Sequence, residues 1–173
     1  MKDSDIKELY EVFRVEEGVA LFLEDHLERL FRGASKARIP MEMDFFEMME
    51  YVKSFLLSST QMEGNARLSF YFDSASRQII SHELRFVPHH YPTNNMYENG
   101  VICGLIEAER DTPEAKIAQG DCRMRCNEQI QKNNIFEVFM TDRHEEITEG
   151  SRSNIFFINR DQLITAPYHR VLP

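Results

Sequence analysis

Tryptophan is absent from the 173 residues, and cysteine, proline and glycine are scarce, with 3, 6 and 7 residues. So little glycine and proline excludes collagen-like and low-complexity chains, which depend on those residues. An odd cysteine count, and a start at Met1-Lys2-Asp3 without an apolar leader, argue against a secreted, disulfide-stapled domain. We therefore predict a reduced, cytoplasmic protein.

Long apolar runs and an excess of positive charge are also missing. The longest apolar stretches, such as 19–23 and 55–57, fall far short of the roughly 20 residues that a membrane-spanning helix needs. Lys and Arg number 20 against 29 Asp and Glu, a formal net charge of −9, which disfavours nonspecific binding to nucleic acid or an anionic membrane. The composition, 42% hydrophobic and 28% charged, is that of an ordinary globular protein.

Two groups of potential metal ligands lack the spacing of a known site. Cys122 and Cys126 share one face of an expected helix, but no histidine or second cysteine pair follows at zinc-site spacing. His89 and His90 lie in a loop rich in helix breakers, with no acidic or thiol ligand at a recognisable distance. We predict semi-buried helix thiols, a solvated histidine loop and no metal.

The first part of the chain predicts an antiparallel sheet with two helices. Strand-like runs on either side of Glu16-Glu17-Gly18 predict a hairpin, and a second hairpin is expected from strands at 66–72 and 78–87. Apolar residues repeat with the helical period at about 25–37 and again, after Pro40, through 45–56. Residues 88–95 are expected to form a loop.

The polar segment 107–114 predicts a domain junction, giving domains 1–112 and 113–173. The elements expected in the second domain are a helix at 121–132 and strands at 135–141, 154–159 and from 163. Both parts mix helices with strands, so the predicted fold class is α+β.

Two short segments contain the candidate catalytic residues. Lys116 stands between Ala115 and Ile117, apolar neighbours that would help to desolvate its amine. Further along, Glu149-Gly-Ser-Arg-Ser-Asn154 is expected to form a tight polar turn that presents backbone N–H groups and one carboxylate at a strand edge. Taken alone, Lys116 also fits a solvated surface lysine and Glu149 an exposed turn carboxylate.

Ordered motifs along the chain resemble the class IV aminotransferases, the fold-type IV pyridoxal-phosphate (PLP) enzymes that include branched-chain and D-amino-acid aminotransferases and aminodeoxychorismate lyase. The matching segments are Tyr10-Glu11-Val-Phe-Arg14 with Gly18, His26-Leu-Glu-Arg29-Leu30, Ala115-Lys116, the turn 149–156, Leu163-Ile-Thr-Ala-Pro167 and Val171-Leu-Pro173. The resemblance implies a two-domain fold-type IV architecture. Its N-terminal antiparallel sheet with two helices would be followed by an incomplete second α/β domain.

The resemblance also implies roles for individual residues. Lys116 would form the Schiff base with PLP and move the proton at the substrate α-carbon, and Glu149 would pair with the pyridinium nitrogen. Arg29 would hold the cofactor phosphate, whereas its helical position alone also allows an ion pair with Asp25. Further cofactor contacts are implied for Ser151, Arg152, Ser153 and Asn154, and substrate contacts for Tyr10 and Arg14.

The implied activity is amino-group transfer between an amino acid and a 2-oxo acid, by a homodimer. Two alternatives stay open: an aminodeoxychorismate lyase-like elimination of pyruvate on the same cofactor, and a truncated, non-catalytic homologue. Compared with the family pattern, the sequence lacks most of the strand before Tyr10 and the Gly-Ile-Thr-Arg and Gly-Thr turns after Pro173 that complete the phosphate site. Asp121 stands where many branched-chain members have a tyrosine. We therefore expect weak or absent PLP binding by this chain.

Overall fold

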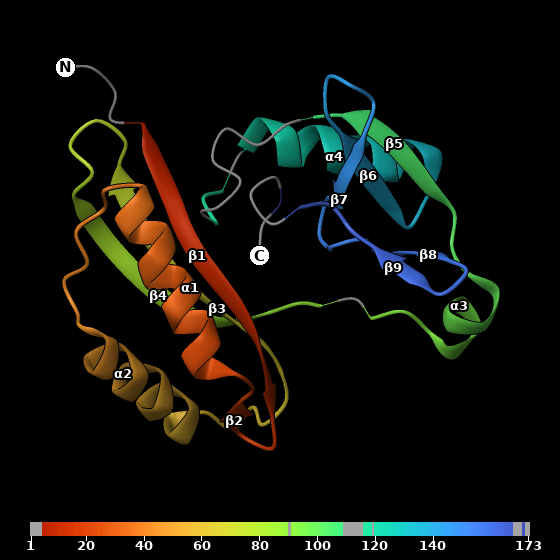
Figure 1. Ribbon diagram of the computed structural model, residues 1–173. Helices are drawn as coiled ribbons and strands as arrows, with labels where there is room; N and C mark the ends of the chain where they lie inside the picture. Colours follow the sequence, from red (N-terminus) through yellow and green to blue (C-terminus); the bar gives the residue numbers. More distant parts are fainter. Residues whose placement is uncertain (1–4, 90, 109–115, 119, 168–170, 172–173) are drawn as a thin grey trace. The chain divides into compact units, whose positions relative to one another are not determined.

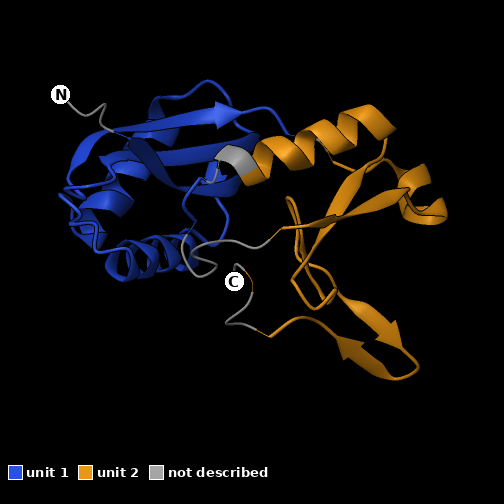
Figure 2. Cartoon of the chain, turned by 90° about the horizontal axis from the view of Figure 1, so that it is seen from above, with its two compact units in different colours: residues 1–90, 115–118 blue, residues 91–114, 119–173 orange. Residues whose placement is uncertain are grey.

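The computed structural model of the protein describes residues 5–89, 91–108, 116–118, 120–167 and 171 (Figure 1). The chain divides into two compact units, one of residues 1–90 with 115–118 and the other of residues 91–114 with 119–173 (Figure 2). Each unit has its own sheet and its own buried cluster of apolar side chains. The assignment of domains to 1–112 and 113–173 stays a prediction.

The first unit is built on a four-stranded antiparallel sheet, which confirms both predicted hairpins. Its strands are β1 (Ile6–Glu16), β2 (Val19–Ala20), β3 (Gly64–Asp73) and β4 (Ile79–Val87), in the order β2-β1-β3-β4. The first hairpin turns at Glu17 and Gly18, whose φ angles of 50° and 77° are typical of a two-residue hairpin turn. Each hairpin joins strands that are adjacent in sequence, whereas β1 pairs with β3 across the intervening β2, α1 and α2.

Two helices, α1 (Leu23–Lys36) and α2 (Phe45–Ser58), complete the first unit at the predicted positions. α1 packs against β1, and α2 packs against α1. α2 begins with a capping box, in which the Asp44 carboxylate accepts from the N–H groups of Phe46 and Glu47, and Glu47 accepts from the N–H of Asp44. The core side chains from strands and helices include Leu9, Phe13, Leu27, Leu30, Met48, Val52, Leu68 and Phe70.

The second unit has a three-stranded sheet in the order β5-β6-β7. β5 (Cys103–Glu107) runs parallel to β6 (Glu137–Thr141), and β6 runs antiparallel to β7 (Ile147–Gly150). Helix α4 (Gly120–Asn133) packs against β5 and β6, and β8 (Phe157–Asn159) and β9 (Gln162–Ile164) form a separate hairpin. The predicted helix and the strands expected at 135–141 and from 163 are confirmed, whereas the strand expected at 154–159 is limited to Phe157–Asn159.

Two local predictions are wrong. The expected loop 88–95 contains the beginning of a short helix, α3 (Asn94–Asn99), whose N-terminal Thr93 hydroxyl accepts from the N–H of Met96. Asparagine-rich sequence has a weak helix propensity, so the pattern gave no signal of this helix. Glu149 lies in β7, opposite Met140, because pairing with β6 continues through Gly150. The turn therefore follows β7 from Ser151, two residues after the carboxylate that it is expected to carry.

Cys122 and Cys126 both lie on helix α4, as expected, whereas Cys103 begins β5. Cys126 is buried and Cys122 half-buried, with the Cys122 sulfur 3.7 Å from that of Met140. Burial, reinforced by the neighbouring Cys122, raises the pKa of Cys126 to about 11, so this thiol stays protonated at neutral pH. Of the two histidines expected in a solvated loop, His90 lies outside the described residues.

The described residues hold no group of three or more His, Cys, Asp or Glu side chains arranged to bind a metal ion. Within the same part of the chain, no helix has the length and apolar character needed to cross a membrane.

Candidate active site

Lys116 is carried by a short segment that pairs with the edge of β1. Ile117 forms an antiparallel bridge with Leu9. On either side of it, the N–H of Tyr10 donates to the carbonyl of Lys116 (3.0 Å), and the N–H of Ala118 donates to the carbonyl of Glu8 (2.7 Å). Backbone pairing therefore holds Lys116 beside the middle of β1, and only 17% of its side chain is exposed. A solvated surface lysine is thereby excluded.

The side chain that Lys116 meets there is Glu11, a carboxylate on the buried face of β1. Leu9 and Phe13 occupy the same face, because side chains two residues apart on a strand point the same way. The Nζ atom of Lys116 lies 3.7 Å from Oε2 of Glu11. Glu11 has no exposed surface, so its charge can be held only by partners inside the protein.

Helix α1 supplies the other partners of Glu11. Nε of Arg29 donates to Oε1 (2.7 Å) and Nη2 donates to Oε2 (2.6 Å), which is a two-pronged contact. Nδ1 of His26 lies 3.1 Å from Oε2. His26 and Arg29 are three residues apart on the helix and so share one of its faces. One carboxylate thus joins side chains from β1, α1 and the segment 116–118.

The cluster shifts the pKa values of both Glu11 and Lys116 downward. Burial is the largest influence on Glu11 and raises its pKa, but hydrogen bonds from Arg29 and His26 and the charge of Lys116 outweigh it and bring the pKa to about 2. Burial also dominates at Lys116, where it lowers the pKa. The Glu11 charge opposes that shift, and the charges of Arg29 and Arg67 add to it. Glu11 is therefore an anion at neutral pH, beside an amine that loses its proton more readily than an ordinary lysine.

A second polar group lies on the opposite face of β1, next to the same lysine. The guanidinium carbon of Arg67, from β3, lies 3.7 Å from the centroid of the Tyr10 ring, and Nζ of Lys116 lies 5.5 Å from it. Arg67 also donates to both carboxylate oxygens of Glu8, and the Ser69 hydroxyl donates to one of them (2.6 Å). Tyr10 is therefore held in place by cation–π contact and not only by the strand.

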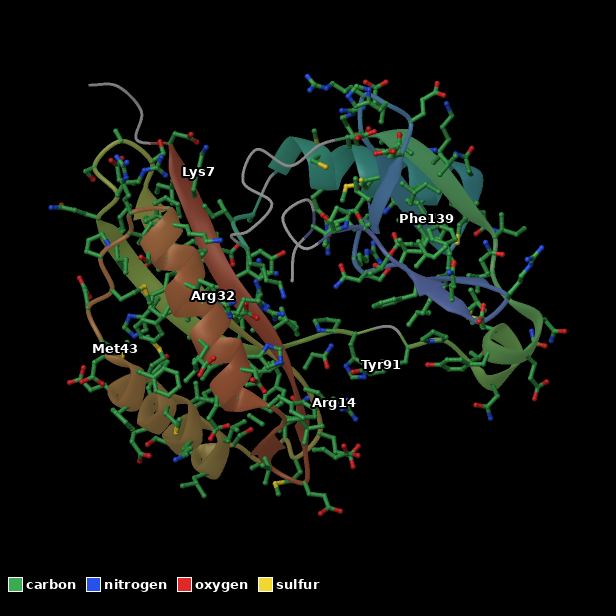
Figure 3. The ribbon with its side chains drawn as sticks, viewed as in Figure 1. Lys7, Arg14, Arg32, Met43, Tyr91 and Phe139 are labelled. Atoms are coloured by element: carbon green, nitrogen blue, oxygen red, sulfur yellow. The ribbon has the colours of Figure 1, made fainter. Side chains whose placement is uncertain are left out.

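The structure brings three of the predicted site residues of the first unit together. Lys116 and Arg29 meet at Glu11, and Tyr10 lies against Lys116. Arg14, labelled in Figure 3, lies further along β1, with its Nη2 3.9 Å from the Glu63 carboxylate.

The remaining predicted residues lie together in the second unit. Glu149 is buried in β7, which excludes an exposed turn carboxylate, and Ser151 is buried directly after it. The hydroxyls of Ser151 and Ser153 donate to Glu137 (2.6 and 3.2 Å). Arg152, Ser153 and Asn154 are the exposed members of the group, and the Arg152 side chain donates to the Asn127 amide oxygen (2.8 Å).

Four side chains that hold these clusters together by hydrogen bonds have no role predicted from the sequence: Glu11, His26, Arg67 and Glu137. A signal existed for Glu11, because it is a charged residue at a position where the alternation of β1 predicts an apolar one. A weaker signal existed for His26, which lies one turn before Arg29. No local pattern distinguishes Arg67 or Glu137 from ordinary strand residues.

The sequence profile of the Amino-transferase class IV family matches residues 8–173. Among solved structures, the chain is similar to the branched-chain amino acid aminotransferase of Escherichia coli, with a TM-score of 0.81 and 18% identity over 96% of this chain and 61% of that chain. A Legionella pneumophila protein provisionally assigned as a 4-amino-4-deoxychorismate lyase gives a TM-score of 0.77 and 20% identity, over 96% and 64% of the two chains.

A third similar structure is a hypothetical aminotransferase from Mycobacterium tuberculosis with α-ketoglutarate and PMP bound, with a TM-score of 0.70 and 17% identity over 96% of this chain and 63% of that chain. Identities this low show a shared fold. The chain spans less than two thirds of the length of each of these relatives. No protein with a curated description matches it in sequence. Because the family profile covers nearly the whole sequence, the chain belongs to the class IV aminotransferases and has their fold-type IV architecture.

Proposed function

We propose that this chain binds PLP and contributes Lys116 to the transfer of an amino group between an amino acid and a 2-oxo acid. One observation carries the proposal: the Lys116 amine is mostly buried and lies 3.7 Å from a buried carboxylate. When bound, PLP supplies an electron sink that lets the substrate α-carbon lose its proton. The class IV family depends on PLP, and its M. tuberculosis relative binds PMP, the amino form of the same cofactor.

The environment of Lys116 suits a nucleophile that also serves as a base. Only a neutral amine can attack a carbonyl carbon or accept a proton, and burial lowers the pKa of Lys116 toward that state. Glu11 has a pKa of about 2 and stays ionised, so it does not compete for the proton. Its part is to orient the amine and to balance the charge beside it.

Arg29 is the proposed ligand of the cofactor phosphate. Glu11 holds the planar guanidinium through Nε and Nη2, and Nη2 also lies 3.0 Å from Nδ1 of His26. A guanidinium whose plane is fixed in this way suits the recognition of a phosphate, because its donor fork matches the phosphate oxygens. The same geometry would be lost in a lysine, which offers a single point charge.

The second unit is proposed to bind the ring of the cofactor. Glu149 is buried, which suits an ion pair with a protonated ring nitrogen better than an exposed carboxylate would. Contacts from Ser151, Arg152, Ser153 and Asn154, and substrate contacts from Tyr10 and Arg14, stay proposals based on the family pattern.

An elimination that releases pyruvate is the second candidate reaction. It is favoured by the similarity to the Legionella protein assigned as a lyase, which is comparable to the similarity to the E. coli aminotransferase. A shared fold does not select between the two reactions. An assay for 4-aminobenzoate, run beside a panel of 2-oxo acids, distinguishes them.

The proposal is tested by covalent labelling. The purified chain is incubated with PLP, reduced with borohydride and digested, and the peptides are searched for a phosphopyridoxyl lysine. We expect the label on Lys116, and we expect it to vanish in Lys116→Ala but to persist in Lys53→Ala, which alters an exposed lysine of α2. A folded protein that takes up no label, or labels Lys53 as strongly as Lys116, would contradict the assignment.

A further inference from the structure

The turn after β7 is held by one buried carboxylate, that of Glu137. Glu137 is the first residue of β6 and is 6% exposed. Its Oε1 accepts from the Ser151 hydroxyl (2.6 Å) and from the N–H of Val138 (2.9 Å). Its Oε2 accepts from the N–H of Arg152 and the hydroxyl of Ser153, each at 3.2 Å. An ionised carboxylate offers about four lone-pair positions, so these four donors fill all of them.

The backbone of the turn is closed around the same carboxylate. The N–H of Gly150 donates to the carbonyl of Ser153 (2.7 Å), and the N–H of Ser151 donates to the carbonyl of Val138 (2.9 Å). A Cβ atom at Gly150 would lie 3.0 Å from the Ser153 carbonyl oxygen and 3.2 Å from Oε2 of Glu137, so a side chain there would displace the turn. The second unit therefore defines the shape of this turn by its own contacts.

Helix α4 also contributes a hydrogen bond to the turn. Nη1 of Arg123 donates to the carbonyl of Ser151 (2.8 Å). Each serine has a single hydroxyl proton, and Ser151 and Ser153 both donate theirs to Glu137. These hydroxyls therefore hold the turn itself and are not available to donate to a second group at the same time.

We propose that Glu137 is a positioning residue, which fixes the backbone of residues 150–153 and with it the direction of the adjoining Glu149 carboxylate. The part of this inference that concerns PLP rests on the proposed function. Glutamine at position 137 would replace one accepting oxygen by an NH2 group, which cannot accept from a backbone N–H, and its remaining oxygen would be a weaker, uncharged acceptor for the donors of the turn. Glu149 would then keep its chemistry and lose its fixed orientation.

A buried carboxylate at the other end of β6, just after the strand, provides the control. Asp142 follows β6, is 5% exposed, and its Oδ1 accepts from the N–H groups of His144 and Glu146, both at 2.9 Å. It organises the turn before β7 as Glu137 organises the turn after it. Each turn contains one arginine, Arg143 or Arg152, so trypsin reports on the opening of each separately.

The first measurement is limited trypsin digestion of the full chain without cofactor, with cleavage followed by mass spectrometry. Glu137→Gln should speed cleavage after Arg152 by about tenfold and leave cleavage after Arg143 nearly unchanged, and Asp142→Asn should show the reverse. If Glu137→Gln does not fold, Ser151→Ala removes one of the bonds and should speed cleavage after Arg152 by about threefold. Equal acceleration at both arginines would overturn the inference.

The second measurement is the PLP concentration that half-labels Lys116 under borohydride. It should rise by about tenfold in Glu137→Gln and stay within about twofold in Asp142→Asn. An unchanged value in Glu137→Gln, together with selective cleavage after Arg152, would overturn the positioning role. A wild-type chain that is never labelled would instead overturn the proposed function, and the digestion would still decide whether Glu137 holds the turn.

Discussion

The amine nitrogen of Lys116 lies 3.7 Å from Oε2 of Glu11, and the same oxygen accepts from Nη2 of Arg29 at 2.6 Å. The three residues come from the segment 116–118, from β1 and from α1. Because Glu11 is completely buried, both cations depend on an anion that water does not reach. The charge of Glu11 therefore contributes both to the stability of the first unit and to the protonation of Lys116.

Glu11→Gln should destabilise the protein by about 3 kcal/mol, because it removes the charge of a buried ion pair and leaves Arg29 and Lys116 without compensation. Urea denaturation at pH 7 measures the loss. Glu83→Gln is the matched control, since Glu83 forms an ion pair with Arg85 in which both side chains are nearly half exposed. Its loss should stay under about 1 kcal/mol. Equal losses in the two variants would contradict this role for Glu11.

The stability of the protein should fall in acid through Glu11. Its pKa is about 2 in the folded state against an ordinary value of 4.5, so the unfolded chain binds more protons between these values. The free energy of unfolding should therefore decrease as the pH falls through this range, with about 3 kcal/mol of the loss due to Glu11. Urea denaturation of wild type and Glu11→Gln at several pH values tests this. Their difference should shrink below about pH 4.5, and a constant difference down to pH 3 would contradict it.

Lys116 should react with amine reagents at a lower pH than an exposed lysine, because burial lowers its pKa. Trinitrobenzenesulfonate modifies only the neutral amine, and peptide mapping yields a separate pH profile for Lys116 and for the exposed Lys53. The midpoints of the two pH profiles are compared instead of the reaction rates, since burial also slows the reaction with the reagent. Glu11→Gln should move the Lys116 midpoint lower still, because the Glu11 charge holds the proton on the amine. A shift to higher pH in that variant would refute the electrostatic account.

The lowered pKa of Lys116 has a second consequence for stability. The unfolded chain binds more protons than the folded one between the folded pKa and 10.5, so the contribution of Lys116 to the free energy of unfolding should rise with pH in that interval. Lys116→Met removes the titrating group and should remove this rise. Lys53→Met should retain it.

Gly150→Ala should destabilise the second unit by about 2 kcal/mol, because the new Cβ would crowd the Ser153 carbonyl and the Glu137 carboxylate. Gly100→Ala isolates the backbone contribution, since no atom lies within 4 Å of its added Cβ but its φ of 74° and ψ of −174° lie in a region essentially reserved for glycine. That backbone cost is about 1–3 kcal/mol. Thermal unfolding measures both variants. A loss at Gly150 below about 0.5 kcal/mol would show that the turn tolerates displacement.

Local periodicity was enough to predict most elements. The alternation in β1 and the repeat of Leu27 and Leu30 in α1 are properties of adjacent residues, and burying one face of each element is the main free-energy gain on folding. The short helix α3 escaped prediction because its polar residues have neither apolar period nor strong propensity. Glu149 was placed in a turn because sequence patterns locate the end of a strand poorly, whereas its pairing with β6 decides that end.

The sequence by itself determined the family, the order of most helices and strands, and Lys116 as the expected nucleophile, because these depend on motifs and periodicities that are present in the linear chain. Only the tertiary structure decided that Glu11 is the anion shared by Arg29 and Lys116, and that Glu137 holds the turn after Glu149. Such pairings join residues far apart in sequence. They form only when backbone pairing and core packing bring the segments together, and burial then sets the charge of each group.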